Sequence, residues 1–282
     1  MRKGLHLKFL GLCFLVLLFS CSREQPPEEQ SITPPISTSV HLTMGNPSGA
    51  TSDVANSLNY QMVKPQYALS YHKDRGTANW VSWHLDKSWI GSAPRQDDFR
   101  TDISLPQGWY RVQADDYSGS GFDRGHNTPS ADRTRNEEDN SATFLMTNMI
   151  PQAPNHNRQT WENFESYCRK LAQDGNELYI IMGNYGTGGT GSAGQMNTIA
   201  NGNVTVPARI WKVIVVLPQG EDDAERVTTT TRVIAVDTPN NNNVSSSWGS
   251  YRTSVDAIEG ATGYNLLSSV AESVQQAIEA RG

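Results

Sequence analysis

Runs of β-branched and other large apolar residues in the second half of the chain constrain its fold more than any other feature. Three of them, Leu178–Met182, Ile210–Leu217 and Thr231–Val236, have the length and composition of strands. Ala142–Asn148 is a further strand candidate. The sequence therefore predicts a protein with a substantial β-sheet.

Two segments have helical character. One runs from about Arg158 to Gln173, and Gly175 supplies its stop. The other runs from Tyr264 to Ala280. The region 41–282 shows no repeat, heptad run or break in composition, and its length fits one large α/β or α+β domain as well as two small ones. We interpret it as one domain.

The N-terminus has the features of an export signal. Arg2, Lys3 and Lys8 are basic, and the segment Phe9–Phe19 is almost wholly apolar. That segment is much shorter than the roughly 20 apolar residues needed to span a bilayer. Residues 1–20 are therefore predicted to be a secretory signal peptide and are left out of fold reasoning.

The signal ends in Leu18-Phe19-Ser20-Cys21, which resembles a bacterial lipobox in which the cysteine receives lipid. Residues 21–40 follow as a Pro-, Glu-, Ser- and Thr-rich stretch that cannot bury enough apolar surface to fold, and we interpret it as a flexible tether. Ser22, where an aspartate would indicate inner-membrane retention, favours an outer-membrane lipoprotein in a bacterial cell envelope. The alternative is an ordinary signal with an incidental cysteine.

The charge balance argues against a wholly basic binding surface. The formal net charge is −6, and removal of residues 1–20 takes away three basic and no acidic residues, which leaves −9. Phosphate contacts normally need positive charge. If the chain binds nucleic acid, the favourable field must come from a local cluster of arginines.

The segment Asp123-Arg124-Gly125-His126 lies in a polar, glycine-rich setting. Gly125 allows the backbone to come close to a ligand, and Arg124 offers a planar fork that suits phosphate oxygens. His126 has a proton affinity that suits a general base near neutral pH. A lone histidine in a loop is more often simply solvated or hydrogen-bonded, so this segment decides little alone.

The predicted helix carries a carboxylate beside its apolar face. On a helical wheel Trp161 and Cys168 share one face, and Glu165 lies on its flank. Because an unpaired buried carboxylate is costly, Glu165 either pairs with a cation or serves a hydrated metal ion. Arg169, one turn on, is placed to form the ion pair. Asn157, at the helix entrance, would by default be a capping residue.

The combined pattern resembles the DNA/RNA non-specific endonucleases, the endonuclease G-like family of ββα-metal nucleases. The resemblance covers most of residues 42–240 and rests on short motifs in a fixed order. The matching residues are Arg95 and Phe99, Asp123–His126, Asn148–Gln152, and Asn157, Trp161, Glu165 and Arg169.

This resemblance implies an α+β fold, with a ββα-metal core on a central, mainly antiparallel sheet flanked by helices. It also implies one divalent cation, Mg²⁺ or alternatively Mn²⁺, held directly by Asn157, with Glu165 holding water on the metal. Sparse protein ligation suits Mg²⁺, which keeps several waters and prefers oxygen donors.

The resemblance further implies a hydrolytic mechanism. His126 is expected to take a proton from the attacking water, and the product is expected to carry a 5′-phosphate. Asn148 is expected to orient His126 or metal-bound water, and Asp123 to brace the loop. The arginines expected to hold the phosphate oxygens are Arg124, Arg169 and Arg95.

All these expected contacts go to phosphate and metal, so no base sequence is read and both DNA and RNA are expected substrates. The alternative is an inactive nuclease-like domain that binds nucleic acid as an envelope lipoprotein. The presence of His126, Asn157, Glu165 and Arg124 together favours an enzyme. A homodimer is left open.

Overall fold

The computed structural model describes Met1 and residues 39–282. The predicted signal peptide, the lipidation site Cys21 and the tether up to residue 38 lie outside the described residues. No helix within the described part of the chain is both long and apolar enough to cross a membrane.

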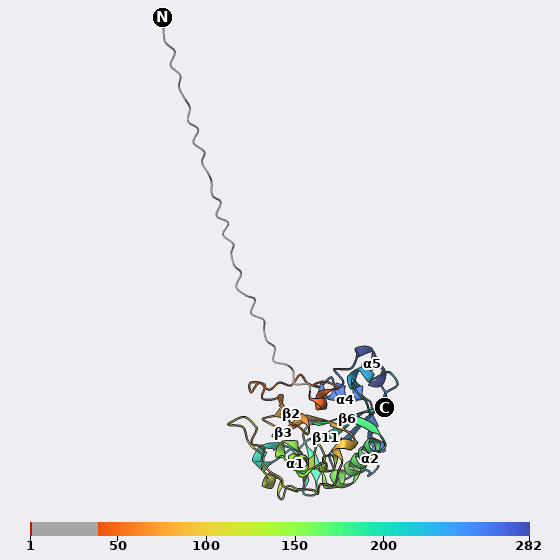
Figure 1. Cartoon of the computed structure of the whole chain (residues 1–282). Coiled ribbons are helices and arrows are strands. Elements are labelled where there is room, and N and C mark those ends of the chain that lie inside the picture. Colours follow the sequence, from red (N-terminus) through yellow and green to blue (C-terminus); the bar gives the residue numbers. More distant parts are fainter. Residues whose placement is uncertain (2–38) are drawn as a thin grey trace. The chain divides into compact units, whose positions relative to one another are not determined.

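A seven-stranded sheet forms the centre of the domain, in the order β1-β2-β3-β6-β11-β12-β13 (Figure 1). Every neighbouring pair in it is antiparallel. The expected antiparallel sheet is confirmed. Its strands are β1 (Tyr60–Val63), β2 (Ala68–His72), β3 (Thr77–Leu85), β6 (Asn176–Tyr185), β11 (Arg209–Pro218), β12 (Arg232–Pro239) and β13 (Arg252–Thr253).

Six further strands form two-stranded ribbons. β4 pairs with β5, β7 with β8, and β9 with β10. Their bounds are Asp123–His126 (β4), Met149–Gln152 (β5), Gly189–Gly191 (β7), Gly194–Met196 (β8), Thr198–Ile199 (β9) and Val204–Thr205 (β10).

The helices are short apart from α2. The α-helices are α1 (Glu137–Ala142), α2 (Glu162–Gln173), α3 (Asp223–Arg226), α4 (Val255–Thr262) and α5 (Glu272–Ile278), and a π-helical turn (His156–Trp161) precedes α2. The 3₁₀ turns are Val40–Leu42, Lys87–Trp89, Ala114–Tyr117, Ser130–Asp132, Met146–Asn148, Ala200–Gly202 and Trp248–Tyr251.

Both faces of the sheet are covered, which explains why its central strands β6 and β11 carry apolar residues on both faces over most of their length. Alternate residues such as Ile180 and Ile214 pack with Phe164 and Cys168 of α2. Their neighbours on the opposite face pack beneath α4, through residues such as Ile258. In Figure 1 the helix α2 accordingly lies on one side of the sheet, and α4 and α5 on the other.

The predicted strand at Ala142–Asn148 is wrong in position. Ala142 ends α1, a 3₁₀ turn covers Met146–Asn148, and the strand β5 begins at Met149. The Asn136 side chain caps α1 by accepting a hydrogen bond from the Asp139 backbone N–H. The helix then extends to Ala142, the first residue of the predicted strand. Tertiary packing then fixes the turn that precedes β5.

The predicted C-terminal helix Tyr264–Ala280 is also wrong over its first half. Helix α4 ends at Thr262, and Gly263 follows it as a C-cap with a left-handed φ of 75°. Between α4 and α5 the buried residues Leu266, Leu267 and Val270 pack against the sheet from a turn-rich segment. Their apolar spacing resembles a helix, although no helix forms there.

Candidate active site

His126 is positioned by the ribbon of β4 and β5, where Gly125 faces Ile150 and His126 faces Met149. A Cβ atom on Gly125 would lie 2.2 Å from Oε1 of Gln152. Only glycine allows this close approach of the two strands. The ribbon and helix α2 together give the strand, strand and helix order that the sequence predicted.

The imidazole of His126 packs against two phenylalanine rings, edge-on to Phe144 and tilted to Phe99. Its centroid lies 4.9 Å from that of Phe144 and 5.7 Å from that of Phe99. The same rings carry the two arginines, because the guanidinium carbon of Arg124 lies 4.0 Å above Phe99 and that of Arg95 lies 4.8 Å above Phe144. The structure therefore gathers three predicted site residues around one aromatic pair.

This environment keeps the imidazole neutral. Burial, followed by the charges of Arg95 and Arg124, lowers the pKa of His126 to about 3. Its Nε2 atom is buried and has no hydrogen-bond partner among the described residues. The imidazole is therefore uncharged and able to accept a proton, while burial and the two cations weaken its basicity, an effect that a bound phosphate anion would oppose.

Asn157 lies in the π-helical turn that leads into α2, and its amide orientation is fixed by Asp123. The Nδ2 atom of Asn157 donates to Oδ2 of Asp123 at 2.9 Å. A carboxylate at this distance accepts only, so the Asn157 carbonyl oxygen must point the other way. Within residues 39–282 no donor is bonded to that oxygen. It is a half-exposed hard oxygen donor, as a magnesium ligand requires.

Asp123 is itself anchored by Arg158, whose Nε and Nη2 atoms donate to its two carboxylate oxygens at 2.8 and 2.6 Å. The first residue of the motif thus braces the metal-ligand candidate. Asp123 was expected to brace its own loop, and the structure shows its carboxylate bound instead to Asn157 and Arg158 of the π-helical turn. Asn157 makes no capping hydrogen bond, because the turn is π-helical from His156 onward.

The buried side chain of His156 fixes the start of the π-helical turn His156–Trp161. Its Nε2 atom lies 2.7 Å from Oγ1 of Thr238 on β12, and its Nδ1 lies 3.0 Å from Nε2 of Gln152 on β5. The fully buried ring therefore ties the π-helical turn to both the central sheet and the ribbon. Sequence reasoning missed this residue, since its role depends on tertiary contacts alone.

Glu165 pairs with a lysine from the sheet and not with its own helix. Nζ of Lys212, on β11, lies 3.3 Å from Oε1 of Glu165, and the lysine side chain is 1% exposed. Burial raises the pKa of Glu165, and Lys212 opposes that rise. Glu165 keeps 15% of its side-chain surface exposed, so it can also meet a hydrated ion.

Arg169 does not form the pair with Glu165 that helical spacing suggested. Its Nη1 atom lies 3.2 Å from Oδ1 of the buried Asp132, and its Nη2 donates to Ser166. Only 17% of the Arg169 side chain is exposed. Arg169 remains within electrostatic range of Glu165 but is already bound to another carboxylate.

Asn148 makes no hydrogen bond to the His126 side chain. It is fully buried, and its Nδ2 donates to the backbone oxygens of Thr128 and Thr143 while its Oδ1 accepts from the Thr128 backbone N–H. These bonds use both ends of the amide. Asn148 therefore clamps the loop that follows His126 without a hydrogen bond to the imidazole, and its expected role toward metal-bound water stays a prediction.

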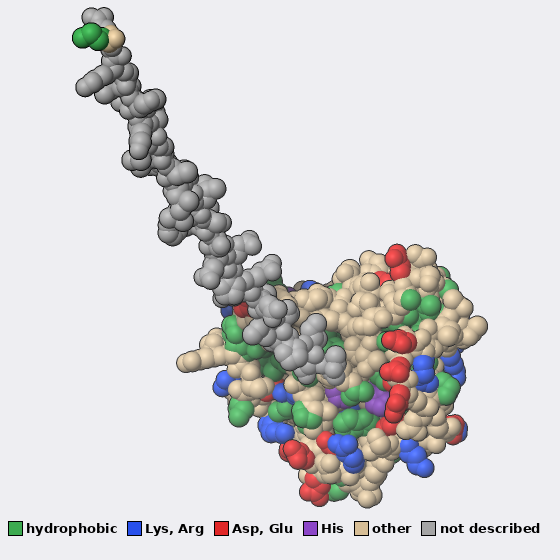
Figure 2. Space-filling model, turned by 45° about the horizontal axis from the view of Figure 1, so that its top comes forward, with side chains coloured by type: hydrophobic (Ala, Val, Ile, Leu, Met, Phe, Trp, Pro, Cys, Tyr) green, Lys and Arg blue, Asp and Glu red, His purple; other side chains and the backbone are tan. Residues whose placement is uncertain are grey.

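The positive charge at the site is local, as the negative net charge requires. The exposed side of the site carries Arg95, Arg124 and Arg158. Figure 2 shows acidic and basic side chains interspersed on the visible face, with no continuous basic surface there. Any attraction for polyanions therefore depends on a few arginines near His126.

Comparison with solved structures identifies the architecture. The crystal structure of an EndoG/EndoGI complex, described as showing the mechanism of EndoG inhibition, matches with a TM-score of 0.66 at 22% identity. The match covers 82% of this chain and 91% of the other. The fold is that of the ββα-metal nucleases.

Sequence comparison identifies the family. The DNA/RNA non-specific endonuclease family model matches residues 45–273. A nuclease from Nostoc sp. is 51% identical over 96% of this chain and 97% of its own length. Human mitochondrial endonuclease G is 31% identical over 56% of this chain and 54% of its own length. The chain belongs to the DNA/RNA non-specific endonuclease family, whose members depend on a divalent metal, and it is an endonuclease of the hydrolase class.

The bond between Asp123 and Asn157 yields a test of whether Asp123 orients the proposed metal ligand. Asp123→Ala should weaken Mg²⁺ affinity by about 10- to 100-fold, the usual cost of removing a group that orients a metal ligand. Arg158→Ala leaves the bond from Asn157 to Asp123 in place and should change the affinity far less. Isothermal titration calorimetry measures both. Equal losses in the two variants would show that Asp123 does not orient the ligand.

Proposed function

We propose that this endonuclease hydrolyses phosphodiester bonds of both DNA and RNA without sequence preference, using His126 as general base and Mg²⁺ held by Asn157. The observation that carries the proposal is the placement of a neutral imidazole between Arg95 and Arg124, on the ribbon whose Asp123 fixes the Asn157 amide. These residues supply a base, anion binding and a metal donor.

The donor set fits magnesium better than zinc. Asn157 offers one hard oxygen, and Glu165 offers a partly exposed carboxylate that can hold metal-bound water. No sulfur or paired-imidazole arrangement accompanies them among residues 39–282. When bound, Mg²⁺ supplies neutralisation of charge on the phosphate and on the departing oxygen.

The protein groups then carry out the hydrolysis. His126 accepts a proton from water as the water oxygen bonds to phosphorus. The bond to the 3′ oxygen breaks, which leaves a 5′-phosphate and a 3′-hydroxyl. Arg124 and Arg95 stabilise the negative charge that develops on the non-bridging oxygens, and Arg169 adds positive potential from behind Glu165.

The lack of sequence and sugar preference follows from the kinds of groups present. Arginine, amide and imidazole groups at this site address phosphate, metal and water, none of which differs between base pairs. Water is the nucleophile, so the 2′-hydroxyl of RNA is not needed.

The decisive experiment is nicking of supercoiled plasmid and cleavage of single-stranded RNA with Mg²⁺, and again with excess EDTA. Both substrates should be cut with Mg²⁺ and neither with EDTA. Asn157→Ala should abolish cleavage at ordinary Mg²⁺ concentrations, with partial rescue at high Mg²⁺. Asn155→Ala is the matched control, because the Asn155 side chain bonds only to Asn242. Cleavage in EDTA, or equal activity in the two variants, would contradict the metal assignment.

The role of His126 predicts an unusual pH dependence. Its neutral form is the base, and with a pKa of about 3 that form persists well below pH 6.5. We expect kcat/KM to hold from pH 7 to about pH 4 and to fall only as pH approaches 3, as far as the fold survives by circular dichroism. His126→Ala should lose about 10²- to 10⁴-fold in kcat. A break near pH 6.5 would contradict the lowered pKa of His126, and a variant with more than about a tenth of wild-type turnover would remove His126 as the base.

We propose further that the enzyme is a lipoprotein of the bacterial envelope, anchored through Cys21. The lipobox-like end of the apolar segment and the tether-like composition of residues 21–40 support this. Multiple acyl chains anchor stably where one anchors marginally. Wild type should incorporate labelled palmitate and fractionate with membranes, and Cys21→Ser should do neither. A soluble, unlabelled wild type would make Cys21 incidental.

A further inference from the structure

The end of helix α5 is joined to the start of helix α4 on the face of the sheet opposite helix α2. The backbone N–H of Asp256, in the first turn of α4, donates to the backbone oxygen of Glu279 at 3.1 Å. Glu279 directly follows α5. This contact brings side chains from the two helices together, on the side of the sheet that does not carry His126 or Asn157.

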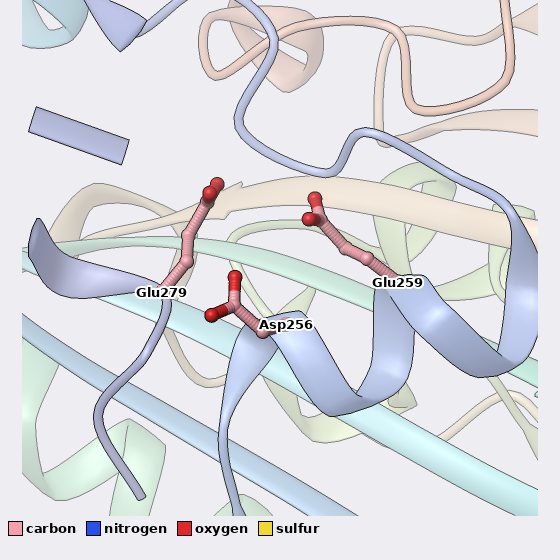
Figure 3. Close-up of side chains that lie close together, drawn as sticks. All are labelled: Asp256, Glu259 and Glu279. Carbon is pink, nitrogen blue, oxygen red and sulfur yellow. The ribbon is translucent and has the colours of Figure 1, made fainter. Parts of the chain in front are cut away.

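Three carboxylates meet at this junction. One oxygen from each of Asp256, Glu259 and Glu279 lies within 4.8 Å of the other two. Figure 3 shows the three side chains pointing toward one another from α4 and from the residue after α5. Among the described residues, no lysine, arginine or histidine lies within 4.0 Å of any of these carboxylates. The concentration of negative charge thus has no basic partner.

Glu279 is the most deeply buried of the three carboxylates, and its side chain lacks a full set of hydrogen-bond partners among the described residues. It is 5% exposed, and its Oε1 atom is buried with no hydrogen-bond partner among the described residues. Burying an unpaired carboxylate is costly, and two neighbouring carboxylates add repulsion. Burial, with the charges of Glu259 and Asp256, raises the pKa of Glu279 to about 7. Either a proton or a metal ion must offset this charge.

We propose that Asp256, Glu259 and Glu279 bind a calcium ion that fastens the C-terminal helix to the body of the domain. Calcium takes oxygen ligands at 2.3–2.6 Å, so two ligand atoms on one ion lie up to about 5 Å apart, which the spacing of these oxygens satisfies. The exposed Asp256 leaves room for the waters that complete six to eight ligands. Glu259 is already oriented, since its Oε1 accepts from the Leu266 backbone N–H at 2.7 Å.

This site is structural and separate from the catalytic cation. The cluster lies over the sheet face covered by Val255 and Ile258 of α4, whereas Phe164 and Cys168 of α2 cover the other face. Calcium binding should therefore change stability without supplying any group to the reaction. A chain fastened in this way resists unfolding from its C-terminal end.

The test uses the full-length chain with Asn157→Ala as background, so that calcium binding at the catalytic site is removed. Calorimetry should detect one calcium ion per chain. The melting temperature should rise by ~5–10 °C between EGTA and calcium at one hundred times Kd. Equal concentrations of magnesium should give a smaller rise, because magnesium sheds its waters reluctantly.

Adding Glu279→Gln should abolish the binding and the calcium-dependent rise. In EGTA the same substitution should raise the melting temperature or leave it unchanged, because it relieves repulsion. Glu272→Gln, on the exposed side of α5, is the matched control and should keep the full response. No binding in the Asn157→Ala background, or an undiminished calcium response after Glu279→Gln, would overturn the proposal and leave a protonated Glu279 as the explanation.

Discussion

The buried charge of Lys212 at the centre of the sheet sets a condition that the surrounding elements must meet. An ammonium group that is 1% exposed is tolerated only with a partner and a polarisable lining. Glu165 provides the partner, and the ring of Trp161 lies 4.8 Å from Nζ. Meeting this need fixes helix α2 against β11 and turns Glu165 inward. The same helix begins at the turn that carries Asn157. The pairing of Lys212 with Glu165 in the core therefore also determines where Asn157 lies.

Much of the fold could be predicted from the sequence, because it depends on local composition. The runs that became β6, β11 and β12 are largely buried on both faces and mostly apolar, with Lys212 as a buried charged exception in β11, and the amphipathic pattern of α2 is regular. The errors occurred where tertiary contacts overrode the pattern. The apolar segment before Met149 became turns because Asn136 caps α1 and Asn148 is bound by the Thr128 loop. The first half of the predicted helix Tyr264–Ala280 became turns that bury Leu266 and Leu267 against the sheet.

In the candidate site, too, the sequence predicted the residues that belong to motifs but not the tertiary partners that hold them. Motif order was enough to single out His126, Arg124, Arg95 and Asn157, which the structure brings to one side of the ribbon and helix. It could not reveal which groups hold them. Arg169 pairs with Asp132 across 37 positions of sequence, Glu165 with Lys212 across 47, and His156 with Thr238 across 82. None of these spacings has a sequence signature, since such partners are set by how the sheet packs.

The pairing of β3 with β6 has a consequence for how the enzyme comes into being. The two strands are neighbours in the sheet, yet all of residues 86–175 lie between them, and this insertion contains Arg95, His126, Asn157 and Glu165. Closing so long a loop is entropically costly and slow, and it is repaid only when β6 docks. A partly synthesised chain that lacks β6 and β11 cannot hold the two halves of the site in register. Nuclease activity is therefore expected only late in folding, after β6 has paired with β3 and residues 86–175 are held between them.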